Sequence, residues 1–442
     1  MNILVLYNAT QTYTNAVFEH LQAFEKFSEH EYFFMHISDK STLQLNLTRF
    51  DAVCVHFSIR LPFDQIPDPV AEVLQAYGGI KFLFIQDEYD NTRHVWAWIH
   101  RLKFDIIFTV VPERSISLVY PPEQFPGTTF VSNLTGYVPT KPSIKIDLAP
   151  PSGRTLIVGY RGRRLPLRYG MLGIEKAKIG MMVQEYCVSR GIRHDIAWEE
   201  RNRIYGERWV EFIFSCRAML GTESGSNIFD WDGDIDKRLA DYKTQHPNAT
   251  DDQIYEEILS GLEQRGLMNQ ISPKVFEAIA ARTVLVLFEG EYSGVLVPDE
   301  HYISLKKDGS NIAEVFRILE DGKRIDQMAD KAYKDIIDSG LYNYSTFIKK
   351  VDGILSHARD KLLSVRVNDA ISVNSNISPE FVTTSPIRSA GHAIGSPMRK
   401  YIFWSEGTLK IIFPLGALWS RLPTSIRTIF LPLARFIRDK IT

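Results

Sequence analysis

The chain is poor in the features that mark zinc-binding, disulfide-bonded and strongly basic proteins. It has three cysteines, Cys54, Cys187 and Cys216, and no CxxC pair or Cys/His cluster with the spacing of a zinc site. Isolated cysteines in apolar segments are typical of buried thiols in a reducing compartment. The formal net charge is −2, so no global charge attracts nucleic acid, and any basic surface must be local.

The sequence also lacks the signals of export and of membrane insertion. Its first residues, MNILVLYNAT, contain neither a basic n-region nor a small-residue cleavage site, so they predict a buried strand and not a signal peptide. No stretch reaches the roughly 18 consecutive apolar residues that a membrane-spanning helix needs. We therefore expect a cytoplasmic location. Hydrophobic residues make up 45% of the 442, enough for large buried cores and two or three domains.

The first part of the chain, 1–140, alternates apolar strands with amphipathic helices. Continuous apolar strands separated by helices indicate a parallel sheet that is covered on both faces, and so a Rossmann-like domain. The predicted strands are 3–7, 31–37, 52–57, 81–85 and 105–110.

A polar, proline-rich stretch at 141–153 is typical of a linker, and the same alternation then restarts. Residues 154–364 predict a second Rossmann-like domain of similar size. A polar segment at 229–270 interrupts it and predicts a helical insertion, with one helix over 251–264.

The two C-terminal segments differ in composition from both domains. Residues 365–397 are rich in Ser, Asn, Pro and Thr, which predicts a disordered linker. The tail, 398–442, has eight Lys or Arg against Glu406 and Asp439, and its apolar residues fall on one helical face. This pattern indicates an amphipathic segment that lies on an anionic membrane surface. The alternative is a helix docked on the protein or on another subunit.

Ligands of doubly wound folds bind beyond the carboxyl ends of the strands, so the strand-to-helix loops of the second domain are the candidate site. Arg161 and Arg163 follow the strand predicted at 155–159, and Lys176 begins the next helix. Arginine forks match phosphate oxygens, so these residues predict a diphosphate clamp. The alternative is a solvated basic loop.

Two further elements of the second domain carry candidate donor-binding residues. The loop that contains Glu223 and Ser224 could hold phosphate with its backbone N–H groups and a sugar hydroxyl with its carboxylate. Ser272 caps a helix that also carries Lys274 and Glu277, and a carboxylate so early in that helix could bind ribose hydroxyls. The alternatives are an ordinary turn and a solvated glutamate.

The stretch SPKVFEAIAARTVLVLFEGEYSGVL resembles the donor-binding segment of glycosyltransferases with the GT-B fold, of the group-one and spore-maturation types. The resemblance covers 156–355 in pattern and is specific near 272–294. It implies two facing Rossmann-like domains that bind a nucleotide-sugar between them. It further implies that Glu277 binds the ribose and that Arg161, Arg163 and Lys176 bind the diphosphate.

The sequence departs from this family at two positions. The first glutamate of the family's E-x7-E motif falls on Asn269, directly after the insertion. We hypothesise that Glu223 supplies the missing carboxylate in space. Lys274 stands where arginine is more usual, which keeps the charge but not the bidentate fork.

Catalytic candidates come from the first domain. Asp87 and Glu88 follow the strand predicted at 81–85, and either carboxylate could deprotonate an acceptor hydroxyl. His56, near the end of another strand, is the alternative base. Each of the three could instead be structural or bind the acceptor.

No obligatory metal is expected. The Asp-rich turn that begins at Asp230 has its glycine at the wrong place for an EF-hand and indicates a capped acidic turn instead. Phosphate charge would then be held by Arg161, Arg163 and helix N-termini.

The sequence therefore predicts a glycosyltransferase that moves a sugar from a nucleotide-sugar to a glycan or lipid-linked acceptor. The basic tail suggests polysaccharide or lipopolysaccharide assembly at the inner face of a membrane. One alternative is an epimerase or phosphorylase acting on sugar nucleotides or glycans. The other is a membrane-tethered, non-catalytic binding or scaffold protein on the same fold.

Overall fold

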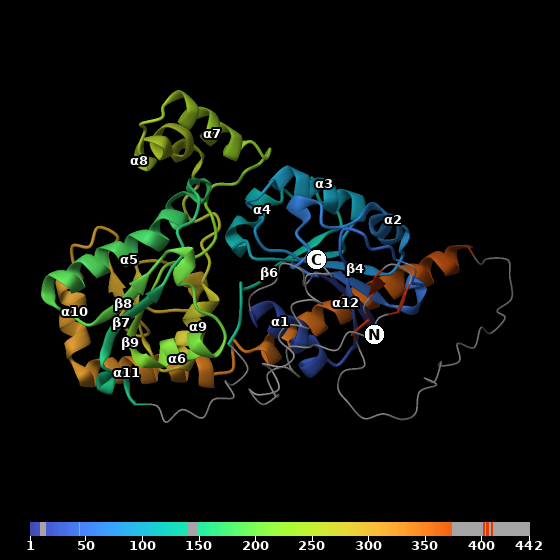
Figure 1. Ribbon diagram of the computed structural model, residues 1–442. Helices are drawn as coiled ribbons and strands as arrows, with labels where there is room; N and C mark the ends of the chain where they lie inside the picture. The colour runs from blue at the N-terminus through green and yellow to red at the C-terminus, as the bar shows by residue number, and fades with distance from the viewer. Residues whose placement is uncertain are drawn as a thin grey trace.

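The computed structural model describes 1–8, 15–43, 45–138 and 149–373, with side chains up to Ser364, and the backbone of 401–402, 404–405 and 408–409. Two α/β units lie side by side, each built around a parallel sheet (Figure 1). The last long helix, α12 (Tyr344–Val373), leaves the second unit and crosses back under the first (Figure 1).

The sheet of the first domain has the order β12-β2-β1-β3-β4-β5-β6, and all of its pairings are parallel. Its strands are apolar and fully buried in the middle because helices cover both faces. They are β1 (Asn2–Tyr7), β2 (Glu31–His36), β3 (Ala52–Val55), β4 (Ile80–Phe84), β5 (Ile106–Thr109), β6 (Thr129–Ser132) and the edge strand β12 (Tyr401–Ile402).

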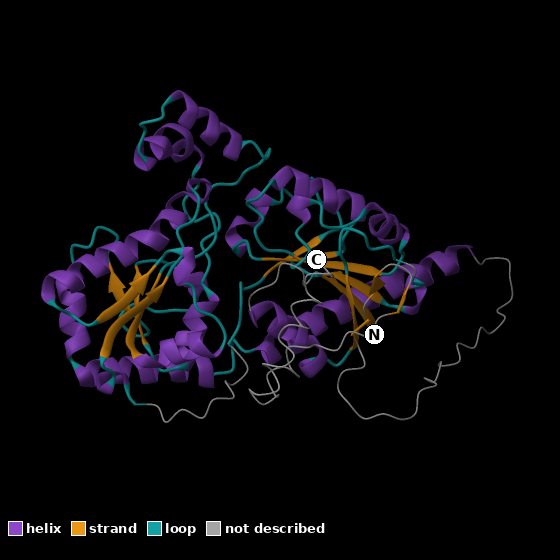
Figure 2. Ribbon diagram, viewed as in Figure 1, coloured by secondary structure: helices purple, strands orange, loops and turns teal. Residues whose placement is uncertain are grey.

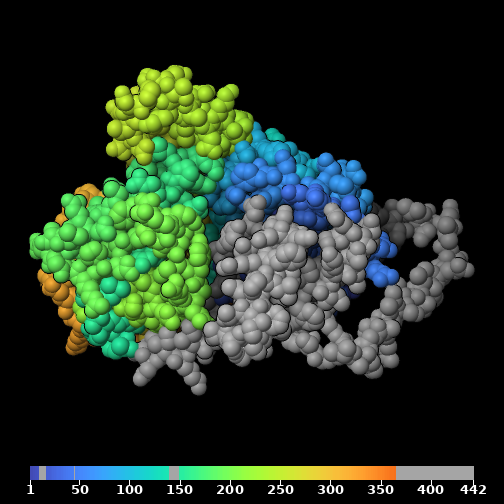
Figure 3. All heavy atoms as spheres, viewed as in Figure 1, coloured from blue at the N-terminus to red at the C-terminus, as the bar shows by residue number. Residues whose placement is uncertain are grey.

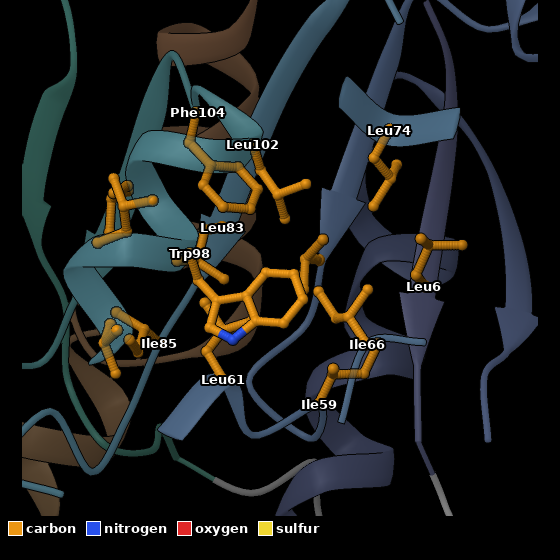
Figure 4. Packing of buried hydrophobic residues seen from close by; sticks show 14 of the residues in the cluster. Leu6, Ile59, Leu61, Ile66, Leu74, Leu83, Ile85, Trp98, Leu102 and Phe104 are labelled. Carbon is orange, nitrogen blue, oxygen red and sulfur yellow. The ribbon is translucent and has the colours of Figure 1, made fainter. Parts of the chain in front are cut away.

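Two hydrophobic clusters pack on opposite faces of this sheet. One contains α2 (Asp68–Ala76) and α3 (Thr92–Leu102), and Figure 4 shows Trp98 of α3 at its centre. The other contains α1 (Asn15–Phe27) and α12, so the returning helix completes the core of the first domain. The short α4 (Ile116–Val119) follows β5.

The second sheet has the order β11-β10-β9-β7-β8 and is also entirely parallel. Its strands are β7 (Leu156–Arg161), β8 (His194–Ala197), β9 (Cys216–Gly221), β10 (Val284–Phe288) and β11 (Ile303–Leu305). Its helices are α5 (Gly170–Arg190), α6 (Glu207–Ser215), α9 (Pro273–Ala280), α10 (Ile312–Glu320) and α11 (Gly322–Ala332). The predicted pair of Rossmann-like domains, each with a parallel sheet between helices, is thus confirmed.

The insertion forms a helical lobe that projects from the second domain (Figures 2 and 3). It contains α7 (Ile235–Gln245) and α8 (Asp251–Ile254). The helix predicted over 251–264 is shorter than expected, because α8 passes into a π-helical turn at Tyr255–Leu259. Asp230 accepts backbone hydrogen bonds from Asp234 at 3.0 Å and Ile235 at 3.4 Å, which agrees with a capped acidic turn.

The predicted linkers and the C-terminal tail are covered in part. Residues 141–148 of the first linker lie outside the described residues. Helix α12 continues to Val373, so 365–373 are helical and do not belong to the second predicted linker. Residues 374–397 lie outside the described residues. So does most of the tail, 398–442, apart from β12 and the small hairpin of β13 (Trp404–Ser405) and β14 (Thr408–Leu409). Among the helices described, none combines the length and apolar character needed to cross a bilayer.

Candidate functional site

Two adjoining cavities occupy the junction of the domains. The smaller, of about 220 Å³, lies within the second domain at the ends of β7 and β9. The larger, of about 370 Å³, has walls from both domains. They share six lining residues, so we treat them as one site with a donor cavity and a cleft cavity: Arg161, Gly162, Arg163, Arg203, Ser272 and Lys274.

Two lysines meet in the donor cavity, and neither forms an ion pair with a carboxylate of the described residues. Lys176 Nζ donates to the Glu223 carbonyl at 3.0 Å and to Ser224 Oγ at 3.1 Å, and Lys274 Nζ donates to the Arg161 carbonyl at 2.8 Å. Burial, and then the charge of Lys274, lower the pKa of Lys176 to about 8. Lys274 remains exposed to solvent within the cleft. Two like charges held together this way are suited to receive an anion.

Arg161 and Arg163 differ in what they can offer a phosphate. The Arg161 guanidinium pairs with Asp195 of β8 at 2.7 Å and stacks over Phe212, 4.3 Å from the ring centroid. It therefore anchors the end of β7. Arg163 is more than half exposed and lies 3.4 Å from Glu200 in a loose ion pair, so it is free to turn toward a ligand.

Glu277 lines the cleft cavity, as the resemblance implied. Its Oε2 accepts a hydrogen bond from Trp209 Nε1 at 2.7 Å, which orients the carboxylate on α9. Desolvation raises the pKa of Glu277, against the hydrogen bond from Trp209 and the charge of Lys274. Ser272 occupies the N-cap position of α9 but its side chain makes no capping hydrogen bond, and it lines both cavities. A carboxylate in this position could accept hydrogen bonds from ribose hydroxyls while the basic cavity beside it holds the diphosphate.

Glu223 lies close to the position expected for the missing motif glutamate, but its carboxylate supports a loop. Oε2 accepts from Asn269 at 2.5 Å, and Oε1 accepts the backbone N–H groups of Glu291 at 3.1 Å and Tyr292 at 2.9 Å. The residue is 3% exposed and lines neither cavity. A Cβ at Gly290 would lie 2.7 Å from Oε2, so this approach requires glycine.

The two ends of the insertion pair with each other through their backbones. Ser224 and Gln270 exchange two backbone hydrogen bonds, at 2.7 and 2.9 Å, so residues 225–269 form a closed excursion. Without that excursion, Glu223 and Glu277 would stand almost at the E-x7-E spacing. Ser224 itself lines the donor cavity, where its hydroxyl meets Lys176.

Two histidines of the first domain near the cleft, His20 and His56, are neutral. His56 Nε2 lies 3.0 Å from His20 Nδ1, and His56 Nδ1 accepts the Ser58 N–H at 3.1 Å. Because Nδ1 accepts, the neutral His56 carries its proton on Nε2 and donates to His20. His20 then carries its own proton on Nε2 and offers no lone pair to an acceptor. Burial lowers the pKa of His20 to about 3 and that of His56 well below its usual range.

The two carboxylates predicted as bases also point away from the cavities. Asp87 accepts from Tyr89 at 2.6 Å and pairs with Arg60 at 3.3 Å. Glu88 is fully buried, accepts from Thr109 at 2.5 Å, and has its pKa raised to about 7 by desolvation. The chain turns after β4 ends at Phe84: Asp87 has a left-handed backbone with φ 60° and its carbonyl accepts from the Asp90 N–H, so of 86–88 only Gln86 lines the cleft cavity.

Sequence reasoning missed four groups of the cleft: His20, Gln86, Arg203 and Trp209. His20 and Trp209 lie on apolar helix faces, where the pattern predicts core residues. Glu19, beside His20, was missed as well. Burial, and then the charge of Glu277, raise its pKa to about 7, so the carboxylates of the two domains sense each other.

A further cavity, of about 670 Å³, opens on the insertion lobe and shares no residue with the site described above. Its lining includes Tyr242 and His246, whose rings lie 4.4 Å apart, together with acidic and amide side chains.

No protein-family model matches the chain, and no curated protein matches it. Several solved structures are similar in fold. An alpha-glucosyltransferase in complex with UDP-glucose and DNA containing an abasic site is 11% identical over 80% of this chain and 98% of its own, with a TM-score of 0.49. The glycosyltransferase SnogD from Streptomyces nogalater is 13% identical over 80% and 99%, with a TM-score of 0.37. Sucrose-phosphate synthase from Thermosynechococcus elongatus is 10% identical over 81% and 98%, with a TM-score of 0.39.

Proposed function

We propose that this protein is a glycosyltransferase that binds a nucleotide-sugar in its second domain and transfers the sugar to an acceptor in the cleft. The observation that carries the proposal is the pair Lys176 and Lys274, which forms no ion pair with any carboxylate of the described residues. Burial lowers the pKa of both lysines, and nearby carboxylates oppose that lowering but form no ion pair with them, so the positive charge of the cavity can still take up an anion. The diphosphate of a nucleotide-sugar supplies that anion.

The remaining contacts set the direction of the donor. With the diphosphate on the lysines and Arg163, the ribose would reach Glu277 and the sugar would face the wall of the first domain. Gln86 and Thr135 line that wall and could hold hydroxyls. The lysines would supply the positive charge that a divalent cation gives in other nucleotide-sugar enzymes, so we propose that no metal is obligatory. The donor helix around Ser272 supports the group-one or spore-maturation type.

The test is donor binding followed by turnover. Titration with UDP and GDP should show micromolar to millimolar binding that the neutral nucleosides lack. Product should then form only when an acceptor is added, because an epimerase needs none. Turnover should persist in EDTA. If neither diphosphate binds, the transferase proposal fails, and a non-catalytic scaffold is favoured.

For the acceptor and the location, we propose a glycan or lipid-linked acceptor in cell-surface polysaccharide or lipopolysaccharide assembly, at the inner face of the membrane. The basic, amphipathic sequence of 398–442 supports this proposal. The full chain should co-sediment with anionic vesicles at low salt, and a chain that ends at Pro397 should not. Equal sedimentation of the two proteins would contradict it.

A further inference from the structure

The segments at both ends of the insertion contact the first domain. The outgoing segment runs through Phe229 and Trp231, and the returning segment runs from Gln264 to Ser272. Phe229, Leu267 and Met268 are almost fully buried in the hydrophobic cluster of the first domain. These residues of the insertion therefore belong to the core of the opposite domain.

The outgoing segment caps a helix of the first domain. The N–H groups of Thr92 and Arg93 at the start of α3 donate to the carbonyls of Asp230 at 2.9 Å and Trp231 at 3.0 Å. Helix N-termini need such partners, and here the other domain supplies them. The Trp231 ring packs on Trp96 of α3, with centroids 5.8 Å apart.

The returning segment is attached to the first domain at three residues. Arg114 donates to the Gly266 carbonyl at 3.2 Å, the Gln270 side-chain amide donates to the Val110 carbonyl, and the Thr135 hydroxyl donates to the Ile271 carbonyl. The next residues of the chain, Ser272 and Pro273, begin the donor helix α9.

The same segment is bonded to two loops, which we call the donor loops: 223–227, whose Ser224 lines the donor cavity, and 289–294, whose backbone binds the Glu223 carboxylate. Gln270 pairs through its backbone with Ser224, and its Oε1 accepts a hydrogen bond from Ser293 Oγ at 3.1 Å. Asn269 holds Glu223, whose carboxylate in turn binds the N–H groups of the turn that contains Tyr292. One continuous set of hydrogen bonds thus joins the first domain to the donor loops.

We propose that the insertion is a strap that sets the donor-binding loops according to the position of the first domain, with Trp231 and Gln270 as positioning residues. The inference rests on the proposed donor site. Loosening the strap on the first domain should free the donor loops although no ligand-contacting group has changed. Donor affinity then depends on an anchorage at α3 that lies outside both cavities.

The test is Trp231→Ala in the full chain, with Trp231→Phe as the conservative variant and Asp241→Ala, exposed on α7, as the matched control. Hydrogen exchange of 223–227 and 289–294 is measured without ligand, and UDP and GDP affinity is then titrated. We expect at least tenfold faster exchange in both segments and about tenfold weaker binding in Trp231→Ala. Trp231→Phe should largely restore both properties, and Asp241→Ala should match the unmodified chain.

The outcomes separate the strap from the function. Unchanged exchange in both segments of a folded Trp231→Ala protein would overturn the strap, even if the nucleotides bind. If Trp231→Ala does not fold, Gln270→Ala replaces it, because this change removes the side-chain links to Val110 and Ser293 and keeps the backbone pair with Ser224. Failure of the unmodified chain to bind UDP or GDP would count against the donor site, whereas the exchange measurement would still decide the strap.

Discussion

The two domains differ in what surrounds their titratable groups near the cleft. The second domain holds Lys176 and Lys274 next to open volume, with neutral oxygens as their only hydrogen-bond partners in the described chain. In the first domain, His20, His56 and Glu88 are buried where the charged form of each is disfavoured. In the proposed function, the second domain would bind the anion, whereas the first would offer the reacting groups a neutral, largely apolar wall.

The largest effect should come from removing the charge of the second domain. Lys176→Met with Lys274→Met should weaken UDP or GDP binding by about a hundredfold or more, since each charge-assisted hydrogen bond contributes about 1.5–3 kcal/mol and tenfold corresponds to about 1.4 kcal/mol. Titration calorimetry gives the affinities. Lys237→Met, on the exposed surface of α7, is the control. If the double variant binds UDP or GDP as tightly as the unmodified chain, the diphosphate does not bind at these lysines. The proposed difference between the two domains would then be wrong.

The next effect concerns the stability of the first domain. Desolvation raises the pKa of Glu88 from 4.5 to about 7, so the stability linked to its neutral form is complete below pH 4.5 and is lost as the pH rises through about 7. Glu88→Gln, which cannot ionise, should raise the free energy of unfolding at pH 8 by about 3 kcal/mol and change it little at pH 4.5.

Urea unfolding at the two pH values measures this difference. Glu72→Gln, exposed on α2, is the matched control and should show no such pH dependence. A Glu88→Gln protein with the same stability gain at both pH values would show that burial does not suppress charge in this domain.

A smaller effect should come from Glu277. If its carboxylate holds the ribose, Glu277→Gln should weaken UDP binding by about tenfold, the value of one hydrogen bond to a charged group. The loss should shrink when the ribose lacks its hydroxyls, so UDP and 2′,3′-dideoxy-UDP are titrated against both proteins. A similar loss for both nucleotides would assign Glu277 to the folding of α9 rather than to the donor.

The last prediction is that the protonation state of His20 and His56 does not change near neutral pH. Burial keeps His20 and His56 neutral, so their imidazole NMR signals should not titrate between pH 5 and 8, with free histidine in the same buffer as the reference. The lowered pKa values also mean that stability linked to the neutral pair is present above pH 6.5 and is lost on acidification. A midpoint near 6.5 for either signal would make the first domain a candidate source of the base.

Much of the second domain's site was predictable because it depends on local sequence. Ser272 and Pro273 suit the N-cap and first positions of a helix, and the apolar residues that follow at helical spacing place Glu277 beside the buried face of α9. The loops after β7 and β9 brought Arg163 and Ser224 to the donor cavity, and the second turn of α5 brought Lys176, as the doubly wound fold requires.

Other roles could not be predicted, because they depend on partners far away in the chain. Arg161 is held by Asp195, and Glu223 binds the turn at Tyr292, so neither side chain is free to meet a phosphate or a sugar. Asp87 is turned toward Tyr89 and Arg60, and Glu88 is buried against Thr109, so neither carboxylate lines the cleft. His20 came to the cleft through a helix whose apolar pattern predicted core packing alone.

By itself, the sequence determined the two parallel sheets, the position of the insertion and the cations of the donor cavity, because hydrophobic periodicity and turn chemistry are local. Only the tertiary structure decided which charges remain free and which are neutralised or buried. It also decided that the insertion belongs in part to the opposite domain, with Trp231 against α3 and Gln270 between the donor loops. The reason is that burial and ion pairing depend on neighbours in space. The local sequence around a lysine or histidine does not show which residues will surround it.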